Sequence, residues 1–381
     1  MARIVVFGAT GYTGRKTAEA LVGRGERPLL AGRNPERLAT LAAGLGDLET
    51  ATADVARPES VRGLVGEGDV LVATVGPFVR YGRPAVEAAI AGRGHYLDST
   101  GEPPFIREVF ERYGPAAARA GVGLLTALGY DWVPGNLAGA LALERAGEQA
   151  VRVDTGYFFT GRASMSGGTR ASTSAIMTEP VFAWRDGRIV TERAARRMRT
   201  FRVGGKDRPA VSVGTSEHFG LPRFAPQLRE VNSYLGWFGT MSRAMQGFSA
   251  FGGAIHRFPG VPRLVDAATT RLVKGSTGGP DDATLAQAGS HIAAIAYDDG
   301  GRDLAEVHVT GVDGYTFTAR FLAWAAAHIA RHGLPAAGAL GPVEAFGLRA
   351  LEAGVAEAGI SEGEASPAGA TPSAAAAVSR P

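Results

Sequence analysis

The chain has 381 residues, of which 45% are hydrophobic, and its formal net charge is only +3. This length and apolar content predict a globular protein with a sizeable core and two domains, and the small net charge argues against a nucleic-acid partner. The sequence contains no cysteine, which excludes disulfides, thiolate metal sites and cysteine nucleophiles, so redox chemistry would need a bound cofactor.

The compartment can be predicted from what the sequence lacks. Strand-like residues begin at residue 3 with no charged and then apolar leader before them. No stretch reaches about 18 uninterrupted apolar residues, the length of a membrane-spanning helix. We therefore expect a cytoplasmic protein without a transmembrane segment.

Short apolar runs alternate with amphipathic stretches from the start of the chain to about residue 128. The runs that read as strands cover residues 3–8, 27–32, 48–55, 69–76, 95–100 and 122–129, and helical patterns such as 13–25 and 82–94 separate them. Strands that are buried on both faces read as continuous apolar runs. The alternation predicts an α/β fold, a Rossmann-like doubly wound parallel sheet, over residues 1–134.

The pattern changes after residue 134. Residues 135–147, 315–333 and 342–355 read as helices, 151–159 alternates as a strand, and 182–190 and 291–309 read as hairpins around Gly-containing turns. Hairpins indicate a mostly antiparallel sheet, so we expect a second α+β domain over 135–340. Residues 361–381 are rich in Ala, Ser, Gly and Pro, which predicts a disordered tail.

An aromatic and methionine-rich segment covers residues 231–258 and has no acidic residue. Its large side chains come at roughly helical spacing: Tyr234, Trp237, Phe238, Met241, Met245, Phe248 and Phe251. Core packing, a homodimer interface, a lid over an apolar substrate and a peripheral membrane-surface helix are all compatible with this pattern.

Five arginines crowd another segment that has few acids: Arg193, Arg196, Arg197, Arg199 and Arg202. They could form a solvated face of a hairpin and helix, or a docking patch for an acidic partner such as a carrier protein.

The first strand runs into three glycines at three-residue spacing, Gly8, Gly11 and Gly14, and then into a helix. A glycine turn between a strand and a helix presents free backbone N–H groups and the helix dipole to a pyrophosphate. We therefore expect a dinucleotide here, with further contacts from Thr10, Tyr12 and Thr13.

The second strand distinguishes between the two nicotinamide dinucleotides. An NAD site usually has an acidic residue at its end to hold the ribose hydroxyls, whereas an NADP site needs a cation for the 2′-phosphate. Here Gly32 is followed by Arg33, and no acid comes before Glu36. Arg33 therefore favours NADP(H), and Asp54, after the third strand, is placed to border the adenine.

Loops at the carboxyl ends of the later strands would line the ligand crevice. Val75, Gly76, Pro77 and Phe78 follow the fourth strand and are expected beside the nicotinamide. Tyr81, Asp98, Glu102, Tyr130 and Asp131 are candidate proton donors or orienting groups, and we select Tyr81, Tyr130 and Asp131 as catalytic candidates.

Two further features concern the second domain and metals. Ser166, Gly167 and Thr169 come at the start of a predicted helix, where amides and hydroxyls could hold a substrate carbonyl or phosphate, although a simple helix cap explains Ser166 equally well. No cluster of histidines has metal-ligand spacing, so we expect no metal site.

Several segments in order along residues 3–355 resemble the saccharopine dehydrogenase-like oxidoreductases, in particular the branch with the mycobacterial trans-acting enoyl reductases. They are GATGYTG, AGRN, VGPFVRYG, HYLDSTGE, LGYDWVPGNLAGALAL, SMSGGTRAS and GPVEAFGL. The resemblance implies a Rossmann domain, an inserted α+β domain with substrate and dimer contacts, a C-terminal helix at 341–360 that returns to the first domain, and NAD(P)-dependent reduction.

The resemblance leaves three functions open. The first is NADPH-dependent reduction of an activated C=C in an acyl or polyketide-like substrate, which is the function we expect. The second is imine reduction or amine oxidation of the saccharopine dehydrogenase type, although no lysine matches the catalytic lysine of those enzymes. The third is NADP(H) binding without turnover.

Overall fold

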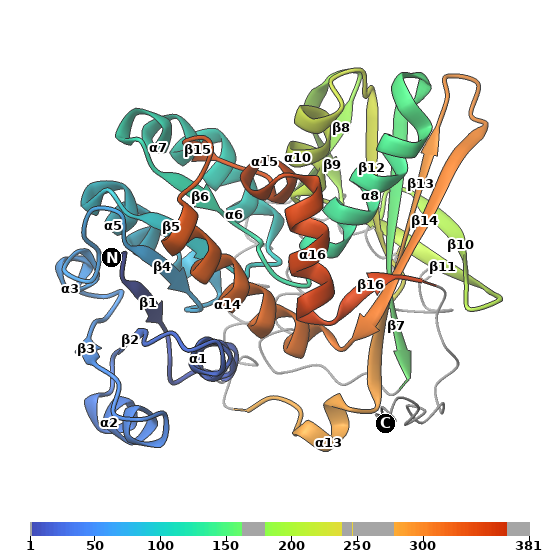
Figure 1. Cartoon of the computed structure of the whole chain (residues 1–381). Helices are drawn as coiled ribbons and strands as arrows, with labels where there is room; N and C mark the ends of the chain where they lie inside the picture. Colours follow the sequence, from blue (N-terminus) through green and yellow to red (C-terminus); the bar gives the residue numbers. More distant parts are fainter. Residues whose placement is uncertain (1, 162–179, 238–245, 247–277, 364–381) are drawn as a thin grey trace, which may run out of the picture.

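The computed structural model describes residues 2–161, 180–237, 246 and 278–363. Two β-sheets organise these residues, and helices pack around and between them (Figure 1). In the described ranges, no helix is long and apolar enough to cross a membrane.

Seven parallel strands form the first sheet, in the order β15-β6-β5-β4-β1-β2-β3. Their bounds are Ile4–Phe7 (β1), Leu29–Gly32 (β2), Thr50–Thr52 (β3), Val70–Ala73 (β4), His95–Asp98 (β5), Gly123–Leu125 (β6) and Gly338–Ala339 (β15). In β1, Val6 pairs with Leu30 on one side and Val72 on the other, and all three side chains are fully buried. The predicted doubly wound parallel sheet is confirmed.

Short helices connect the strands of the first sheet. They are α1 (Tyr12–Gly23), α2 (Pro35–Gly44), α3 (Pro58–Arg62), α4 (Phe78–Tyr81), α5 (Arg83–Gly92), α6 (Pro103–Glu108), a π-helical turn (Val109–Tyr113) and α7 (Gly114–Ala120). Each connection brings the chain back so that the next strand runs in the same direction. The carboxyl ends of the strands, with the loops that follow them, therefore meet at one edge of the sheet.

The second sheet is mixed and has nine strands. They are β7 (Arg152–Gly161), β8 (Pro180–Arg185), β9 (Arg188–Arg193), β10 (Met198–Val203), β11 (Lys206–Val213), β12 (Glu230–Leu235), β13 (Ala288–Tyr297), β14 (Asp303–Val312) and β16 (Ile360–Glu362). All pairings are antiparallel except β7 with β12. The two predicted hairpins, β8–β9 and β13–β14, are confirmed.

Helix α8 (Val133–Ala146) carries the chain from the first sheet to the second, where it packs against β7, β13 and β14. The remaining helical elements are a 3-10 turn (Gly147–Gln149), α10 (Glu217–Phe224), α13 (Asp282–Leu285), α14 (Gly314–His332), α15 (Pro342–Phe346) and α16 (Leu348–Ala358). A single hydrophobic cluster contains Val72 of the first sheet, Trp132 before α8 and Ile292 of the second sheet. The two sheets therefore share a core, and the loop before α8 lies within it.

The end of the chain differs from the prediction in two respects. The return to the first sheet begins before residue 341, because α14 packs against α1 and β4, and β15 pairs with β6. The apolar face of α14, including Phe317 and Phe321, is what this packing buries. The predicted tail also starts too early, since residues 360–362 form β16 and pair with β14 in the second sheet. Residues 364–381 lie outside the described ranges.

The aromatic segment at 231–258 begins as a strand and not as a helix. Its described part contains β12, in which Tyr234 and Leu235 are buried, and then Trp237, which is partly buried. The rest, apart from Gln246, lies outside the described residues, so the interface, lid and membrane interpretations remain predictions.

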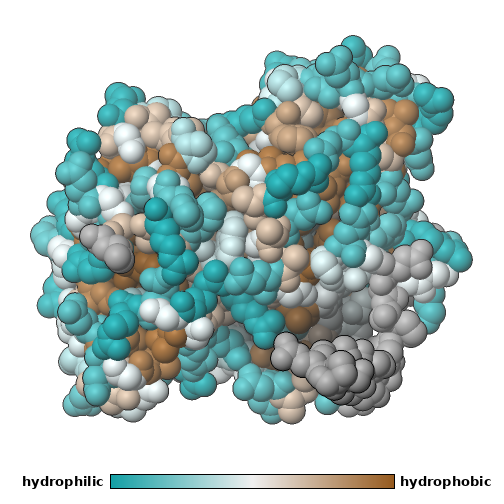
Figure 2. Space-filling model, in the orientation of Figure 1, coloured by the Kyte–Doolittle hydropathy of each residue, from teal (hydrophilic) through white to brown (hydrophobic). Residues whose placement is uncertain are grey.

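Hydrophilic side chains cover much of the face shown in Figure 2, and apolar patches interrupt them over both lobes. Among the described residues, Val79 and Phe224 are the large hydrophobic side chains classed as exposed, at 38% and 36%. Most large apolar side chains of the described part are therefore used in packing.

Candidate functional site

The turn after β1 is held tightly by its first and last glycines. Gly8 has a φ of +91°, and a Cβ atom there would lie 2.7 Å from Oγ1 of Thr74. A Cβ atom at Gly14 would lie equally close to this hydroxyl and would overlap the carbonyl oxygen of Gly8. The Thr74 hydroxyl itself donates to the carbonyl of Phe7, at 3.0 Å. Packing of β1, α1 and β4 therefore requires Gly8 and Gly14 independently of any ligand.

Gly11 has no comparable packing reason. It is exposed, its φ of −77° and ψ of 168° suit any residue, and a Cβ atom there would meet only the Gly8 carbonyl oxygen, at 3.2 Å, among the described atoms. Gly11 is the N-cap of α1, and no described side chain caps this helix end. A helix start without a described side-chain cap, with its free amides and its dipole, fits a dinucleotide pyrophosphate.

The threonines and the tyrosine of this loop have different environments. Thr10 and Thr13 are partly buried beside the open helix end. The Tyr12 hydroxyl donates to the carbonyl of Pro280, at 2.7 Å, and its ring packs edge-on against Tyr315. The Tyr12 side chain thus joins the loop to the segment before α13, and its contact with a phosphate stays a prediction.

Arg33 is exposed directly after β2. The next residue, Asn34, caps α2 by accepting a hydrogen bond from the amide of Arg37, at 2.9 Å. In the described part of the chain, no acidic side chain forms an ion pair with Arg33. The guanidinium group can therefore meet a phosphate at the end of β2, as the sequence predicts.

Asp54, the predicted neighbour of the adenine, closes a turn after β3. Its Oδ1 atom accepts a hydrogen bond from the amide of Ala56, at 3.0 Å. The carboxylate is therefore used in a local turn at the expected edge of the sheet.

The loop after β4 presents a different surface from the one predicted. Val75 is partly buried and Gly76 and Pro77 are exposed, whereas Phe78 is buried against Phe105, with 5.7 Å between ring centroids. The Phe78 ring therefore packs between α4 and α6, although the sequence analysis expected it beside the nicotinamide. Gly76 and Pro77 remain at the edge of the sheet.

Glu102, in the loop after β5, holds the loop after β4 in place. Its two carboxylate oxygens accept hydrogen bonds from the amides of Phe78 and Val79, both at 2.9 Å, at the start of α4. Tyr81, at the end of α4, is partly buried and has the guanidinium of Arg80 over its ring, 5.0 Å from the centroid. Glu102 thus has a structural task, and Tyr81 belongs to a separate element from Tyr130 and Asp131.

Asp98 also has a structural task. It is fully buried at the end of β5, where Oδ1 accepts hydrogen bonds from the amides of Thr100 and Ala127, and Oδ2 accepts one from the hydroxyl of Thr126. Burial raises the pKa of Asp98 to about 6 although these donors oppose the shift. Asp98 ties the ends of β5 and β6 together and supports the loop that carries Tyr130 and Asp131.

Tyr130 and Asp131 both lie in the loop between β6 and α8. Tyr130 is buried with its ring stacked on Phe159, at 5.8 Å between centroids, and burial raises its pKa well above the usual range. Asp131 is partly buried beside Gly101, where a Cβ atom would lie 2.9 Å from Asp131 Oδ2.

The carboxyl group of Asp131 has the properties of a proton donor. Its Oδ1 atom is buried and has no hydrogen-bond partner among the described residues. Burial raises the pKa of Asp131 to about 7, so the group carries a proton close to neutral pH. Of the three catalytic candidates, Asp131 combines this pKa with a position at the carboxyl edge of the first sheet.

Two residues that the sequence analysis did not select lie next to this loop. The Tyr157 hydroxyl of β7 donates to Oε1 of Glu217, at 2.7 Å, and accepts a hydrogen bond from the amide of Gly135, at 2.9 Å. Glu217 is fully buried in the first turn of α10, and burial raises its pKa to about 7. The alternation of 151–159 could have identified Tyr157 as an inward-facing residue, but no signal in the sequence marks Glu217.

Aromatic rings continue from Tyr130 along the second sheet. Phe159 stacks on Tyr130 and also on Trp237, with 4.8 Å between the centroids of Phe159 and Trp237. Tyr130, Phe159 and Trp237 thus form an aromatic wall that begins at the residue before Asp131, and aromatic side chains are typical of sites for apolar ligands.

The arginine cluster is partly paired with acids of the second sheet. Arg197 pairs with Glu192, and Arg199 pairs with Asp154. In the described part of this region, residues 198–203 form a strand and not the predicted helix face. Arg202 pairs with Asp207 as well, at 3.2 Å, and the docking role stays a prediction.

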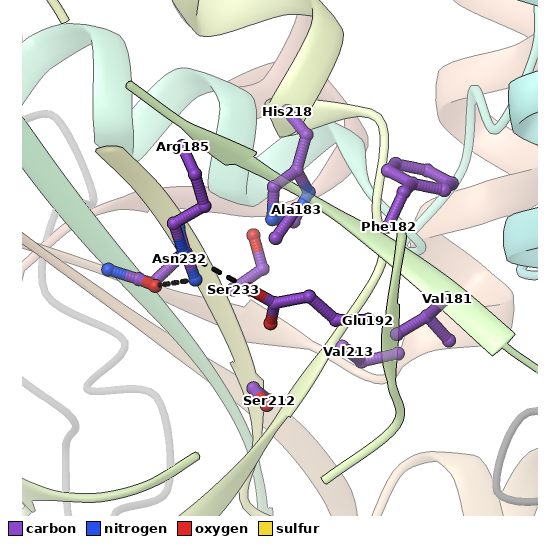
Figure 3. Close-up of a pocket in the computed structure, with 10 residues that line it drawn as sticks. All are labelled: Val181, Phe182, Ala183, Arg185, Glu192, Ser212, Val213, His218, Asn232 and Ser233. Atoms are coloured by element: carbon purple, nitrogen blue, oxygen red, sulfur yellow. Dashed lines mark hydrogen bonds and ion pairs between the residues drawn. The ribbon is translucent and has the colours of Figure 1, made fainter. Parts of the chain in front are cut away.

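A small polar cavity lies between β8, β11, β12 and α10 (Figure 3). Arg185 points toward Asn232 and Glu192 there, donating to Asn232 Oδ1 at 2.5 Å and lying 3.4 Å from Glu192. The volume is about 10 Å³, enough for about one water molecule. This cavity cannot hold a substrate.

Two further predictions concern the second domain and metal binding. Ser166, Gly167 and Thr169 lie outside the described residues, so their substrate role stays a prediction. In the ranges that the structure describes, no group of three His, Cys, Asp or Glu side chains could hold a metal ion.

No family model matches the chain. A protein of Mycobacterium tuberculosis that is provisionally named a trans-acting enoyl reductase is 35% identical over 184 residues, which cover 46% of this chain and 44% of that protein. The trans-acting enoyl reductase of Mycobacterium leprae is 39% identical over 140 residues, 35% of this chain and 34% of the relative. The similarity thus spans less than half the length of these curated relatives.

Two solved structures cover almost the whole chain. Saccharopine dehydrogenase (L-Glu forming) from Saccharomyces cerevisiae matches 95% of this chain and 99% of its own, with a TM-score of 0.58 and 13% identity. Homospermidine synthase from Legionella pneumophila, in complex with NAD, matches 96% and 91%, with a TM-score of 0.56 and 9% identity. The chain has the fold of saccharopine dehydrogenase, and the resemblance found in the sequence motifs is confirmed.

Proposed function

We propose that the protein is an NADPH-dependent oxidoreductase that reduces an activated C=C bond of an acyl or polyketide-like substrate. The observation that carries the proposal is the protonated-acid character of Asp131 at the same sheet edge as the open glycine turn. The names of the curated relatives, trans-acting enoyl reductases, support the choice of reaction.

The residues of the first sheet fit the cofactor. The amides at the start of α1, beside Gly11, would hold the pyrophosphate, and Arg33 would hold the 2′-phosphate of the adenosine ribose. Gly76 and Pro77 would border the nicotinamide. When bound, NADPH supplies a hydride to one carbon of the C=C bond.

The chain itself would supply the proton. After a hydride has been added to the β-carbon, the α-carbon of the thioester carries the extra electron pair. The Asp131 carboxyl group would give its proton to that carbon, so that a C–H bond forms, and the resulting carboxylate would regain a proton from water. The aromatic wall of Tyr130, Phe159 and Trp237 would hold the apolar chain of the substrate.

The proposal assigns a role to each of the two domains and suggests the partners of the protein. Residues 1–134 would hold the cofactor, and residues 135–340 would hold the substrate and contact a second copy of the chain. A carrier-bound substrate would let the remaining arginines of the cluster, such as Arg196, meet an acidic carrier protein. We place the protein in the cytoplasm.

A second candidate is oxidoreduction at a C–N bond, which the fold of saccharopine dehydrogenase favours. The two reactions can be separated by following NADPH absorbance with two substrate panels at matched concentration. Enoyl thioesters of increasing chain length test the first proposal, and 2-oxo acids mixed with amines test the second. Consumption with the thioesters alone supports enoyl reduction, and consumption with the second panel alone rejects it. If neither panel is consumed while NADPH still binds, cofactor binding without turnover is supported instead.

A further inference from the structure

A short segment of the chain that leads into the second sheet lies against the glycine turn of the first. Residues 279–282, which we call the strap, run into α13 just before β13. The strap lies beside the start of α1, so that Tyr12 and Pro280 are in contact although 268 positions separate them (Figure 1). The part of the chain that carries the second sheet therefore touches the proposed cofactor turn here.

Two polar contacts attach the strap to α1. The Tyr12 hydroxyl donates to the carbonyl of Pro280, at 2.7 Å, and Nζ of Lys16 lies 2.8 Å from Oδ1 of Asp282. Lys16 is one helical turn after Tyr12, and its ammonium group lies 5.5 Å from the centroid of the Tyr12 ring. Because the Asp282 side chain is 91% exposed, water screens the ion pair, and the Tyr12 contact carries more of the attachment.

The strap also fits closely against the Tyr12 ring. A Cβ atom at Gly279 would lie 2.6 Å from two carbon atoms of this ring, which is far below an ordinary contact distance. Gly279 does not have a positive φ, so a glycine is needed here for space and not for backbone conformation. The Tyr12 ring meets Tyr315 of α14 as well, edge-on at 5.3 Å between centroids. The ring is therefore held by two elements that lie outside the first sheet and its connecting helices.

Tyr12 connects the strap with the cofactor because it is the first residue of α1. Its backbone amide is one of the free amides of the first turn that we assign to the pyrophosphate. Contacts that hold its side chain therefore also restrict the turn that carries this amide. A binding turn that is already ordered loses less conformational freedom when it binds a ligand, and it opens less often to release one.

The charge of the strap argues against a direct contact with the pyrophosphate. Asp281 and Asp282 are both acidic, and acidic side chains repel an anion. Asp281 is in addition used as the N-cap of α13, where it accepts a hydrogen bond from the amide of Thr284, at 2.8 Å. The strap can therefore favour cofactor binding only through its attachment to α1.

We propose that the strap is a positioning element of the cofactor site, which holds the first turn of α1 through Tyr12 and slows the release of NADPH. The inference rests on the proposed function for the identity of the cofactor. It assigns to the second domain a share in holding the cofactor, in addition to the substrate.

The test measures the rate at which the full chain releases NADPH, by stopped-flow fluorescence after mixing with excess NADP⁺. Gly279→Ala pushes the strap away from the Tyr12 ring and should raise this rate about fivefold or more. In a Tyr12→Ala background the same substitution should have little further effect, because the ring that it displaces is missing. A release rate that is unchanged in a folded Gly279→Ala protein would overturn the proposal, and a lower Tm with this unchanged rate would indicate a role in stability alone.

Asp282→Asn provides a second test in which two explanations predict opposite signs. Loss of the ion pair with Lys16 should speed release by about two- to threefold. Removal of a negative charge near an anionic cofactor would by itself slow release. Faster release therefore supports the attachment, and slower release contradicts it.

The control is Asp299→Asn, since Asp299 is also exposed and pairs with Arg229 at the same distance of 2.8 Å, in the turn between β13 and β14. This variant should release NADPH at the natural rate. A natural protein that binds no NADPH would reject the proposed function. A natural protein that binds NADPH, with variants that release it at the natural rate, would reject only the role of the strap.

Discussion

The hydroxyl group of Tyr157 lies 2.7 Å from Oε1 of Glu217, in the interior between the two sheets. These residues are 60 positions apart in the chain, and both belong to the part that carries the second sheet. Their hydrogen bond reaches the backbone beside Asp131, which follows the last strand before α8. The second sheet and α10 are thus joined by hydrogen bonds to the loop that carries the proposed acid.

Gly135 tests whether this arrangement depends on close packing. A Cβ atom at position 135 would overlap both the Tyr157 hydroxyl and Glu217 Oε1. Gly135→Ala should therefore separate the two side chains and lower the Tm by several degrees, as about 2 kcal/mol of overpacking would. Gly63→Ala, on the surface with no contact of its added Cβ atom under 3.7 Å, is the control and should leave the Tm nearly unchanged. Equal Tm values for the Gly135 variant and this control would contradict the close packing of Tyr157 and Glu217 around position 135.

Substitutions of Gly14 and Gly11, in the turn after β1, should have different effects. Gly14→Ala introduces an overlap with the backbone of Gly8 and should lower the Tm by several degrees, as about 2 kcal/mol of overpacking would. Gly11→Ala should leave the Tm nearly unchanged but weaken NADPH binding, because the added methyl group occupies space for the pyrophosphate. Thermal unfolding and fluorescence titration with NADPH measure the two effects separately. Normal NADPH affinity in Gly11→Ala would contradict the proposed position of the pyrophosphate.

Arg33 should set the preference for the phosphorylated cofactor. Loss of a charge-assisted hydrogen bond costs about 1.5–3 kcal/mol, so Arg33→Ala should weaken NADPH binding by roughly 10- to 100-fold and leave NADH binding nearly the same. Arg62→Ala, another exposed arginine of the first sheet region, is the control and should change neither affinity. Equal affinities of the natural protein for NADPH and NADH would reject the preference.

Three carboxyl groups with raised pKa values contribute stability that falls as the pH rises. Burial raises the pKa of Asp98 to about 6 and that of Asp131 and Glu217 to about 7, so the folded state binds more protons than the unfolded chain between about pH 4 and 7. Their contribution is complete below the unfolded pKa values and is lost as the pH passes through 6 to 7.

Histidines oppose this trend, because burial lowers the pKa of His218 to about 3 and that of His291 to about 4, so their contribution to stability rises over the same pH range. The test therefore compares variants. For a fully buried group such as Glu217, the loss between pH 5.5 and pH 8 is on the order of 2 kcal/mol, which corresponds to several degrees of Tm. Glu217→Gln should remove that part of the pH dependence, whereas Glu144→Gln, on the surface and paired with Arg349, should not. The same change of Tm with pH in Glu217→Gln and in the natural protein would contradict the raised pKa of Glu217.

The sequence predicted the first sheet well because its signals are local. Apolar runs with helices between them identify parallel strands, and Gly8, Gly11, Gly14 and Arg33 are close enough in the chain to be interpreted as one nucleotide site. The structure adds that Gly8 and Gly14 are needed for packing, so Gly11 is the informative glycine.

The side chains of the site could be predicted less well, because their orientation depends on distant residues. Phe78 follows a strand at the carboxyl edge of the first sheet, as predicted, but its ring packs inward against Phe105. Glu217 is buried only because α10 packs against α8 and meets Tyr157 there. No local sequence pattern predicts such a contact. Asp131, in contrast, could be selected as a catalytic candidate because it follows a strand of the first sheet.

The most direct test of the account follows a labelled hydride. The protein is incubated with an enoyl thioester and NADPH that carries deuterium on the transferring face of C4, and the product is analysed by mass spectrometry and NMR. The account predicts a saturated thioester with one deuterium at the β-carbon and a solvent proton at the α-carbon, formed much more slowly by Asp131→Asn. Binding of NADPH without deuterium in any product, across thioesters of all chain lengths, would contradict it.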